Sequence, residues 1–280
     1  MKVCPQLLYC ESEKDMKEKF VFEDPYQLCV RCGHCIAICP PEAILYKNAG
    51  EVYTFDGTKK LEEIVSYDEL MKILRMRRSI RVFKDKPVPK EKIEKVLETM
   101  RYAPSASNRQ NWRYTIITNK DEIEYLKKEN MKFFRNARRA LPFRHLITPF
   151  LPYGARRRVL NPKVKMQLER GIERIKQGED IIFFDAPCVI LLYSRKYASS
   201  LAANDAGIAL THGMLAAQSL GLGTCWIGLA QRKLMNNRRL SKHFKVPKGF
   251  IVFGVMTLGI PAVQYLRGPP RRPLRVQWFE

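Results

Sequence analysis

Residues 29–40 read Cys-Val-Arg-Cys-Gly-His-Cys-Ile-Ala-Ile-Cys-Pro, and this run decides how the N-terminal part of the chain folds. Its four cysteines have the spacing C-x2-C-x2-C-x3-C and are followed by proline. Thiolates at these gaps can wrap a loop around one iron–sulfur cube, and this is the bacterial spacing for a [4Fe–4S] cluster. A structural zinc site favours two separated pairs of ligands, which the run lacks. The sequence therefore predicts a cluster bound by the cysteines of the run, which are Cys29, Cys32, Cys35 and Cys39.

Cys4 is an alternative fourth ligand. Its context, Cys-Pro, repeats the Cys39-Pro40 end of the run and suggests the two similar halves of a ferredoxin-like fold. In two-cluster ferredoxins the cysteine before each proline ligates the other cluster. We expect either Cys4 or Cys39 to complete a single cluster. If the natural protein begins upstream of Met1 and contains three more cysteines there, we expect a second cluster as well. The plain alternative is that Cys4 and Cys10 are unligated thiols.

Length and composition fit a globular chain with one large core and a small module. The chain has 280 residues, 46% of them hydrophobic, which is ordinary for a soluble protein. No run approaches the ~20 apolar residues of a membrane span, and residues 1–11 lack the anatomy of a signal peptide. Six of the eight cysteines precede residue 40. Such clustering favours metal binding in a reducing compartment, so we expect a cytoplasmic protein.

The net charge of +22 favours acidic partners through long-range attraction. No nucleic-acid-binding motif accompanies this charge, so the sequence predicts no nucleic-acid partner. The excess is uneven, because residues 132–177 contain thirteen Lys and Arg but only two acidic residues. This basic segment therefore carries about half of the excess positive charge of the chain.

A second domain begins near residue 61. Ser66-Tyr67-Asp68-Glu69 has the form of a helix capping box, and apolar residues at helical spacing follow Pro89. An alanine-rich helix is expected over 201–220, with Gly221 as its C′ residue. Strand-like apolar runs occupy residues 114–118, 188–194 and 250–258. Strands separated by long helices predict an α+β or α/β layer fold.

Three motifs in this domain gather polar or small residues. Residues 77–81 read Arg-Arg-Ser-Ile-Arg, and the forked donors of arginine suit phosphate oxygens. Residues 103–112 read Ala-Pro-Ser-Ala-Ser-Asn-Arg-Gln-Asn-Trp, a turn dense in short polar side chains. Residues 221–228 read Gly-Leu-Gly-Thr-Cys-Trp-Ile-Gly, which we expect to form a loop whose backbone can approach a flat ligand. Neither a Rossmann fingerprint nor a P-loop is present.

With Leu-Gly-Ile-Pro at 258–261, these motifs follow one another in an order that resembles the nitroreductase family of FMN-dependent oxidoreductases. The resemblance covers residues 66–280, and the cysteine run is similar to the ferredoxin-fused branch of that family. It implies a ferredoxin-type [4Fe–4S] module over 1–60 and an α+β FMN-binding domain over 61–280. It also implies a homodimer with FMN sites at its interface.

The resemblance implies roles for single residues of the arginine motif. Arg77 and Arg271 would hold the FMN phosphate. Arg78 and Ser79 would lie near the phosphate or the ribityl chain. Arg81 would face the pyrimidine edge of the flavin, where a positive charge favours the anionic reduced form.

Two further stretches would complete the flavin site. The turn over 103–112 would approach from the second subunit, and backbone groups near the end of the glycine-rich stretch would lie near flavin N5. The plain alternative for the turn is ordinary side-chain capping. Cys225 and Cys188 are expected to be structural, with Cys225 near the flavin as an alternative, and His34 is expected at the surface. The flavin-binding residues expected here are Pro104, Ser105, Asn108, Gln110, Ile227 and Gly228.

In the nitroreductase family the region corresponding to 132–178 varies and covers the active site. The resemblance therefore implies a basic lid, whose apolar residues shape the pocket and whose charges select an acidic partner or an anionic substrate. A membrane-surface patch and a plain solvated helix over 163–177 remain alternatives.

The cysteine run and the family resemblance together imply an oxidoreductase that passes electrons from a [4Fe–4S] cluster to FMN and on to a small oxidised molecule. The resemblance implies that this acceptor is a nitroaromatic or a quinone. No catalytic side chain is expected, since the flavin carries the chemistry. The donor is expected to be an acidic ferredoxin or flavodoxin, with NAD(P)H left open. Two alternatives remain: an electron-carrier or FMN-storage protein without a dedicated substrate, and a flavoenzyme resembling reductive dehalogenases.

Overall fold

The computed structural model describes residues 3–11, 20–39, 43, 44, 53, 60, 63–143, 146, 148–150, 153–197 and 199–280. The chain divides into two compact units, one of residues 1–67 with 104–110 and one of residues 68–103 with 111–280. The domain boundary expected between residues 60 and 61 falls at the edge of a stretch outside the described residues.

The first unit contains the cysteine run. Strand β1 (Tyr9–Glu11) pairs antiparallel with β2 (Phe20–Phe22), and the rings of Tyr9 and Phe22 meet edge to face at 5.3 Å. The short helix α1 (His34–Ile38) begins inside the cysteine run, after Gly33 in a left-handed conformation with φ of 76°. Because a glycine lacks Cβ, it adopts this conformation without steric cost. His34 is exposed, as expected.

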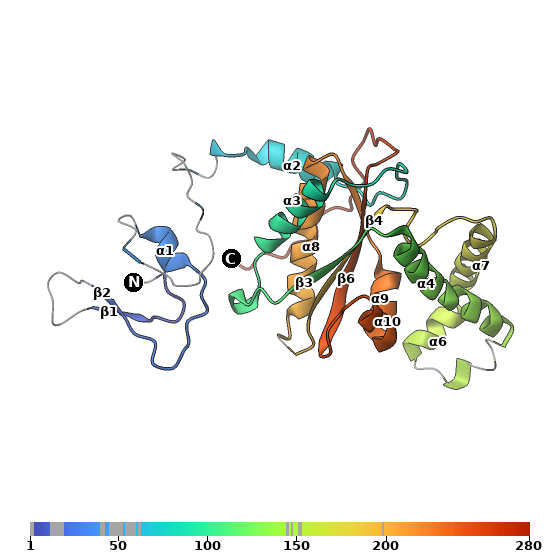
Figure 1. The fold of residues 1–280 in the computed structure, drawn as a ribbon, viewed down its shortest axis with the longest axis horizontal. Helices are drawn as coiled ribbons and strands as arrows, with labels where there is room; N and C mark the ends of the chain where they lie inside the picture. Colours follow the sequence, from blue (N-terminus) through green and yellow to red (C-terminus); the bar gives the residue numbers. More distant parts are fainter. Residues whose placement is uncertain are drawn as a thin grey trace. The chain divides into compact units, whose positions relative to one another are not determined.

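The second unit is built on an antiparallel sheet with the strand order β3-β4-β6-β5 (Figure 1). The predicted strands are confirmed as β3 (Arg113–Ile117), β4 (Cys188–Arg195) and β6 (Phe250–Gly259). The loop expected over 221–228 is wrong in part, because β5 (Gly223–Trp226) pairs with β6. Of its three glycines, Gly221 follows the end of one helix, Gly223 begins β5, and Gly228 begins the next helix.

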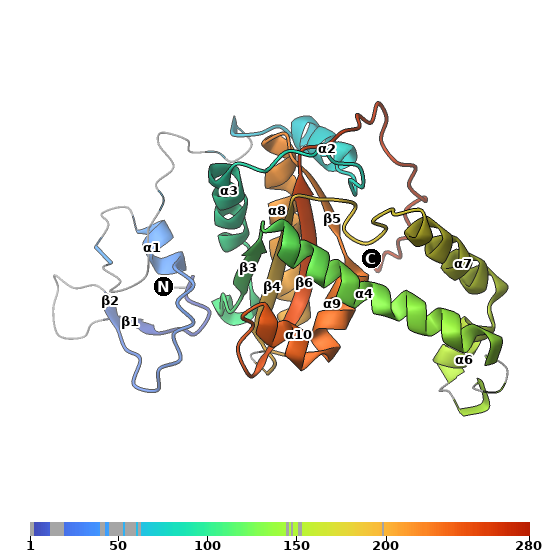
Figure 2. The ribbon, with the colours of Figure 1, turned by 45° about the vertical axis from the view of Figure 1, so that its right-hand side comes forward.

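Helices cover both faces of this sheet (Figure 2). Helices α3 (Lys90–Arg101) and α8 (Ala202–Ser219) pack on one face, and α4 (Lys120–Ala140), α9 (Gly228–Asn236) and α10 (Arg238–His243) pack on the other. Along β4 the side chains alternate between the two cores, as a strand requires. Cys188, Ile190 and Leu192 face the α3 and α8 side, and Val189, Leu191 and Tyr193 face the other. The α+β prediction for this unit is confirmed.

Two helix ends follow the sequence closely. The predicted helix after Pro89 is confirmed as α3, with Ile93, Val96 and Met100 buried. Helix α8 ends at the predicted glycine, because Gly221 has φ of 73°. Its N–H donates to Gln218 O at 3.1 Å, and the N–H of Leu222 donates to Ala217 O at 2.8 Å. This pair of bonds is the Schellman motif, which satisfies carbonyls at the end of the helix.

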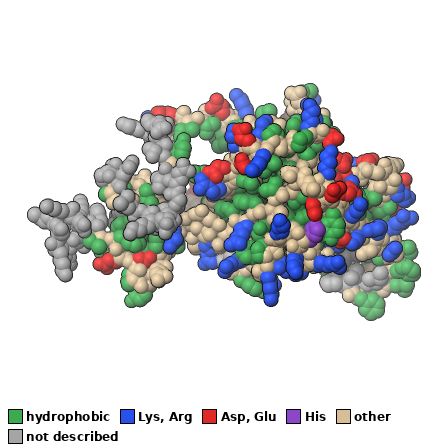
Figure 3. Space-filling model, viewed as in Figure 1, with side chains coloured by type: hydrophobic (Ala, Val, Ile, Leu, Met, Phe, Trp, Pro, Cys, Tyr) green, Lys and Arg blue, Asp and Glu red, His purple; other side chains and the backbone are tan. Residues whose placement is uncertain are grey.

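The basic segment consists mainly of helices. After α4 come the short turns η3 (Leu141–Phe143) and η4 (Thr148–Phe150), then α6 (Tyr153–Leu160) and α7 (Pro162–Lys176). The predicted helix over 163–177 is confirmed as α7, whose first turn is capped by Asn161 through a bond from Lys163 N at 2.9 Å. Lys and Arg side chains gather over α4, α6 and α7 on the right-hand side of the visible face (Figure 3).

The C-terminal tail departs from expectation. The alternation of Leu274, Val276 and Trp278 with other residues predicts a strand at the end of the chain. Residues 262–280 form none in the described structure. Leu274, Trp278 and Phe279 are all more than 80% exposed. A strand needs the edge of a sheet as its partner, and the tail reaches none in the single chain. No helix among the described residues is both long enough and apolar enough to span a membrane.

Candidate cofactor sites

The arginine motif is fixed against strand β5. It follows α2 (Tyr67–Met76), whose end is tied to α8 by a bond from Gln218 Nε2 to Ile73 O at 3.1 Å. Ser79 then forms a parallel bridge with Thr224, and the N–H of Ile80 donates to Thr224 O at 2.9 Å. The side chain of Ile80 is buried. The backbone of 77–81 is therefore held by the sheet, which leaves its polar side chains in defined positions.

Arg78 has a buried nitrogen that lacks a partner. Its Nη2 donates to the carbonyl of Arg267, and its Cζ lies 5.6 Å from the ring centroid of Tyr265. Its Nη1 is buried without a hydrogen-bond partner among the described residues. Leaving such a donor unpaired costs about 1–3 kcal/mol. A phosphate oxygen is the kind of acceptor that would satisfy it, so this nitrogen fits an anionic group of a ligand.

Ser79 and Arg81 reach the thiol of Cys225, and the charge of Arg77 also acts on it. Burial raises the pKa of Cys225, whereas Arg81, Ser79 and Arg77 act in the opposite direction. The thiol is 3% exposed, which agrees with the structural role expected for it. The alternate residues Arg77, Ser79 and Arg81 thus lie on the Cys225 side of the motif, whereas Arg78 contacts Tyr265 and Arg267 of the tail.

Arg81 has a second neighbour that the sequence did not predict. Its Cζ lies 5.8 Å from the ring centroid of Phe184. Phe184 belongs to the turn between α7 and β4, more than one hundred residues away in the chain. No local pattern around Phe184 indicates this contact, because only the tertiary fold brings the two residues together.

The backbone groups expected near flavin N5 differ in their availability. The N–H of Ile227 donates to Val255 O at 2.8 Å and so is already used. Gly228 is exposed and is the first residue of α9. A backbone N–H at the first turn of a helix lacks an intrahelical acceptor. Of the two predicted residues, Gly228 therefore has the N–H that can reach a ligand.

The turn over 104–110 belongs to the first unit. Ser105 Oγ accepts the N–H of Gln110 at 2.9 Å, and Gln110 Nε2 donates to Asn108 Oδ1 at 3.0 Å. Asn108 Nδ2 in turn donates to the carbonyl of Arg31, inside the cysteine run, at 2.6 Å. The capping bonds match the plain reading of this turn after Pro104, and the bond to Arg31 was not predicted.

Arg271 lies in the tail after β6. Its guanidinium is exposed, and Nη1 donates to the carbonyl of Pro270 at 3.4 Å. This hydrogen bond is long, and it joins two adjacent residues. The contact of Arg271 with a phosphate, which the family resemblance implies, stays a prediction.

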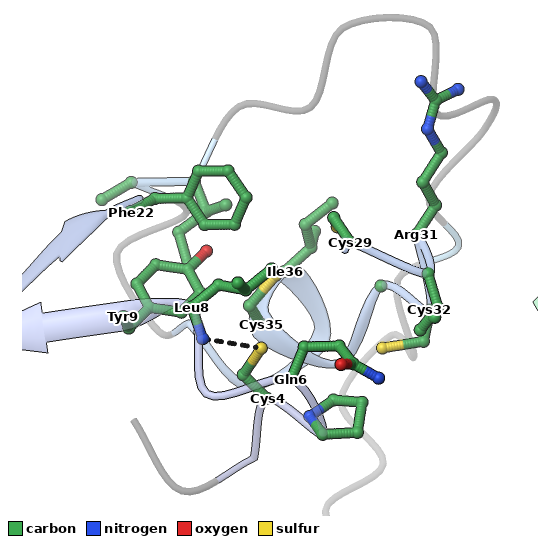
Figure 4. A pocket seen from close by; sticks show the side chains of 15 residues that line it. Cys4, Gln6, Leu8, Tyr9, Phe22, Cys29, Arg31, Cys32, Cys35 and Ile36 are labelled. Atoms are coloured by element: carbon green, nitrogen blue, oxygen red, sulfur yellow. Dashed lines mark hydrogen bonds between the residues drawn. The ribbon is translucent and has the colours of Figure 1, made fainter. Parts of the chain in front are cut away.

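Four cysteines line one cavity of about 330 Å³ in the first unit. Figure 4 shows Cys4, Cys29, Cys32 and Cys35 around it, together with Tyr9. Cys4 Sγ accepts the N–H of Leu8 at 3.5 Å. Burial raises the pKa of Tyr9 most, and the nearby Cys35, Cys4 and Cys29 raise it further.

Cys39 is not among the described residues that line this cavity. It follows α1, and its N–H donates to Ile36 O at 3.2 Å. The sequence left Cys4 and Cys39 open as the fourth ligand. The cavity brings Cys4 together with three cysteines of the run and leaves Cys39 outside.

The structure shows four thiols in the wall of this cavity, but no metal site among the described residues. Among the described residues, no three His, Cys, Asp or Glu side chains are close enough to share one metal ion. In a [4Fe–4S] cube each cysteine binds a different iron atom, so its four thiolates surround the cube without meeting at one point. An open cavity with four thiols in its wall matches that requirement.

Most of the second unit matches a known protein family. The protein-family model described as "Nitroreductase family" matches residues 74–260, which is more than half of the chain. The chain belongs to the nitroreductase family. This confirms the enzyme class expected from the sequence, a flavin-dependent oxidoreductase of the nitroreductase type.

Relatives of this nitroreductase-family chain align with most of its length, although their sequence identity to it is low. A putative NADH dehydrogenase/NAD(P)H nitroreductase of Methanothermobacter thermautotrophicus is 28% identical over 73% of this chain and 84% of its own length. An FMN reductase [NAD(P)H] of Bacillus subtilis is 28% identical over 72% and 70%. The structure of a nitroreductase with bound FMN from Bacteroides fragilis has a TM-score of 0.56 at 21% identity, covering 76% of this chain and 99% of that one. The similarity to this solved structure supports the fold of the second unit.

Proposed function

We propose that the chain is an FMN-dependent oxidoreductase that reduces a small oxidised acceptor, such as a nitroaromatic or a quinone. The observation that carries this proposal is the buried, unpartnered Nη1 of Arg78. Arg78 belongs to the arginine motif, which packs against β5. Relatives named as an FMN reductase and as a nitroreductase with bound FMN support it. When bound, FMN supplies hydride and one-electron transfer, and an iron–sulfur cluster supplies single electrons.

Each side chain of the arginine motif has a binding task in this proposal. Arg78 and Arg77 hold the phosphate of FMN, with Ser79 beside it. Arg81 places a positive charge at the pyrimidine edge of the flavin, which favours the reduced anion. Gly228 offers its backbone N–H near flavin N5, and Arg271 reaches the phosphate from the tail.

A homodimer is the second part of the proposal. In the single chain, Leu70, Ile73 and Leu74 of α2 are between 37% and 41% exposed, although they form the apolar face of that helix. Trp278 and Phe279 of the tail are exposed as well. Exposed apolar side chains of this kind suit an interface, and a second copy would bury the same residues on both subunits. The turn residues Pro104, Ser105, Asn108 and Gln110 would then approach the flavin of the partner subunit.

The third part is a [4Fe–4S] cluster in the cavity of the first unit. Its ligands are Cys4, Cys29, Cys32 and Cys35, the four cysteines in the cavity wall. An acidic ferredoxin or flavodoxin fits the net charge of +22 as the electron donor, because opposite charges steer the two proteins together.

The basic lid over 132–178 is the fourth part. Phe143, Phe150 and Tyr153 are more than half exposed, and cations lie among them. Apolar side chains with surrounding positive charge suit a planar acceptor that carries an acidic group. We therefore assign the choice of acceptor to this segment.

One anaerobic experiment tests the proposal. The protein is purified under argon, reconstituted with iron, sulfide and FMN, and analysed for all three. NADH, NADPH and reduced ferredoxin are then offered separately while the flavin absorbance and the EPR signal of the cluster are followed. We expect about one FMN and four irons per chain, and reoxidation by nitroaromatics or quinones much faster than that of free FMN.

The outcomes separate the parts of the proposal. A protein that binds no FMN contradicts the proposed function. FMN without iron would remove the cluster and keep the oxidoreductase. A loaded protein that no small molecule reoxidises faster than free FMN would instead be an electron carrier or an FMN store.

A further inference from the structure

A buried carboxylate organises the turn between α7 and β4. The side chain of Asp180 is 6% exposed. Its Oδ1 accepts the N–H groups of Ile182 at 2.9 Å and Phe183 at 3.0 Å, and its Oδ2 accepts the N–H of Asp185 at 3.3 Å. A buried carboxylate with three backbone donors is well satisfied, and charge-assisted bonds of this kind are stronger than neutral ones. Asp180 thus fixes the course of the backbone over the next five residues.

This course includes two strained residues. Phe184 and Asp185 have φ of 60° and 52°, a left-handed conformation that is unfavourable for residues other than glycine. Such conformations persist only when the surroundings enforce them, and they are common at functional sites. The enforcing contacts are the bonds to Asp180 and the buried side chains of Ile182 and Phe183.

The strained turn aims one aromatic ring at the arginine motif. Phe184 is partly buried against the core on the α4 and α9 side, and its ring centroid lies 5.8 Å from Cζ of Arg81. Arg81 also reaches the thiol of Cys225. An exposed arginine otherwise samples many rotamers. Here an aromatic face and a buried thiol restrict its guanidinium.

We propose that Phe184, fixed in place by Asp180, is a positioning residue for the guanidinium of Arg81. The proposal rests on the proposed function, in which Arg81 lies at the pyrimidine edge of the flavin. Phe184 acts through a cation–π contact with Arg81. Asp180 acts one step earlier, by holding the backbone that orients the ring.

The first test is a double-mutant cycle on the holoenzyme, with FMN affinity and the flavin midpoint potential as readouts. Phe184→Leu should weaken FMN binding about two- to fivefold, the size expected for loss of one exposed cation–π contact, and should lower the potential. Phe184→Tyr keeps the ring and should match the parent. Arg81→Ala should lower the potential, and adding Phe184→Leu to it should have no further effect, because the two act as one unit.

Asp180→Ala should reproduce the effects of Phe184→Leu and also lower the unfolding temperature. Since this variant removes a buried hydrogen-bonded group, its folding is checked by circular dichroism, and Phe184→Leu carries the test if it does not fold. Additive effects of Phe184→Leu and Arg81→Ala would overturn the proposal. An unchanged potential in Phe184→Leu would do the same.

A second measurement is independent of FMN. In the apoprotein, the aromatic ring should shift the Nε–H resonance of Arg81 in a proton–nitrogen NMR spectrum, and Phe184→Leu should move that resonance. No movement overturns the positioning role even if FMN binds normally. Failure of the parent protein to bind FMN, with the resonance moved as expected, contradicts the proposed function and leaves the contact itself established.

Discussion

Gly223 and Ile80 lie so close together that a Cβ on Gly223 would be 2.6 Å from Cγ1 of Ile80. Gly223 opens β5, and Ile80 stands in the middle of the arginine motif. The absence of a side chain at Gly223 is therefore what allows the motif to pack against the sheet. In the sequence this glycine indicated close approach of a ligand, whereas in the structure the close approach is to Ile80.

Gly223→Ala should accordingly displace the motif from β5. Overpacking of this kind costs about 1–3 kcal/mol of unfolding free energy. FMN affinity should fall with it, because Arg78 and Arg81 lie within two residues of Ile80 in the chain. Urea unfolding and FMN titration measure the two effects. The matched control is Gly207→Ala in α8, where a Cβ meets nothing within 4 Å and alanine is the better helix former. Equal stability loss in both variants would contradict the explanation.

Arg78→Ala should weaken FMN binding by about ten- to a hundredfold, the equivalent of about 1.5–3 kcal/mol for a hydrogen bond to a charged group. Riboflavin, which lacks the phosphate, should bind Arg78→Ala and the parent about equally. Comparing the two ligands by fluorescence titration therefore separates phosphate binding from general damage to the site. Arg195→Ala is a suitable control, since Arg195 also stacks on an aromatic ring, that of Phe250 at 5.9 Å. A penalty for riboflavin as large as that for FMN would remove Arg78 from the phosphate site.

Sequence patterns predicted what depends on local chemistry. The helix after Pro89, the strand at β4 and the C′ role of Gly221 all follow from periodicity or backbone preference, and each is confirmed. Contacts between distant segments carried no such signal. The stacking of Arg81 on Phe184 and the bond from Asn108 to Arg31 depend on tertiary packing, which no spacing in the sequence encodes. The tail strand failed for a related reason, because a strand forms only where an edge is available.

The buried thiol of Cys188 should make the protein less stable at alkaline pH. It is fully buried in β4, and burial raises its pKa from 9.0 to about 12. As pH rises from about 9 to about 12, the unfolded chain releases this proton while the folded chain keeps it. The unfolding free energy therefore falls by about 1.4 kcal/mol per pH unit. Cys188→Val removes the titrating group and replaces it with a small apolar side chain that suits a strand.

The unfolding free energy of Cys188→Val should thus decline less steeply between pH 9 and pH 11 than that of the parent. Lysines and tyrosines titrate in the same window, but they do so in both proteins and cancel in the comparison. Urea unfolding at several pH values measures the difference. If the unfolding free energies of the two proteins decline in parallel, the thiol of Cys188 ionises in the folded chain with an ordinary pKa.

The choice between Cys4 and Cys39 can be decided by single substitutions. Cys4 lines the cavity with Cys29, Cys32 and Cys35, and Cys39 does not. Cys4→Ser should therefore abolish or strongly reduce the four-iron content after reconstitution, whereas Cys39→Ser should retain it. Cys10→Ser is the control for loss of a thiol as such, since Cys10 is exposed on β1. Iron and sulfide analysis with EPR of the reduced protein gives the readout. Retention of the cluster in Cys4→Ser together with its loss in Cys39→Ser would return the fourth ligand to the end of the cysteine run, and would mean that metal binding draws Cys39 into the cavity.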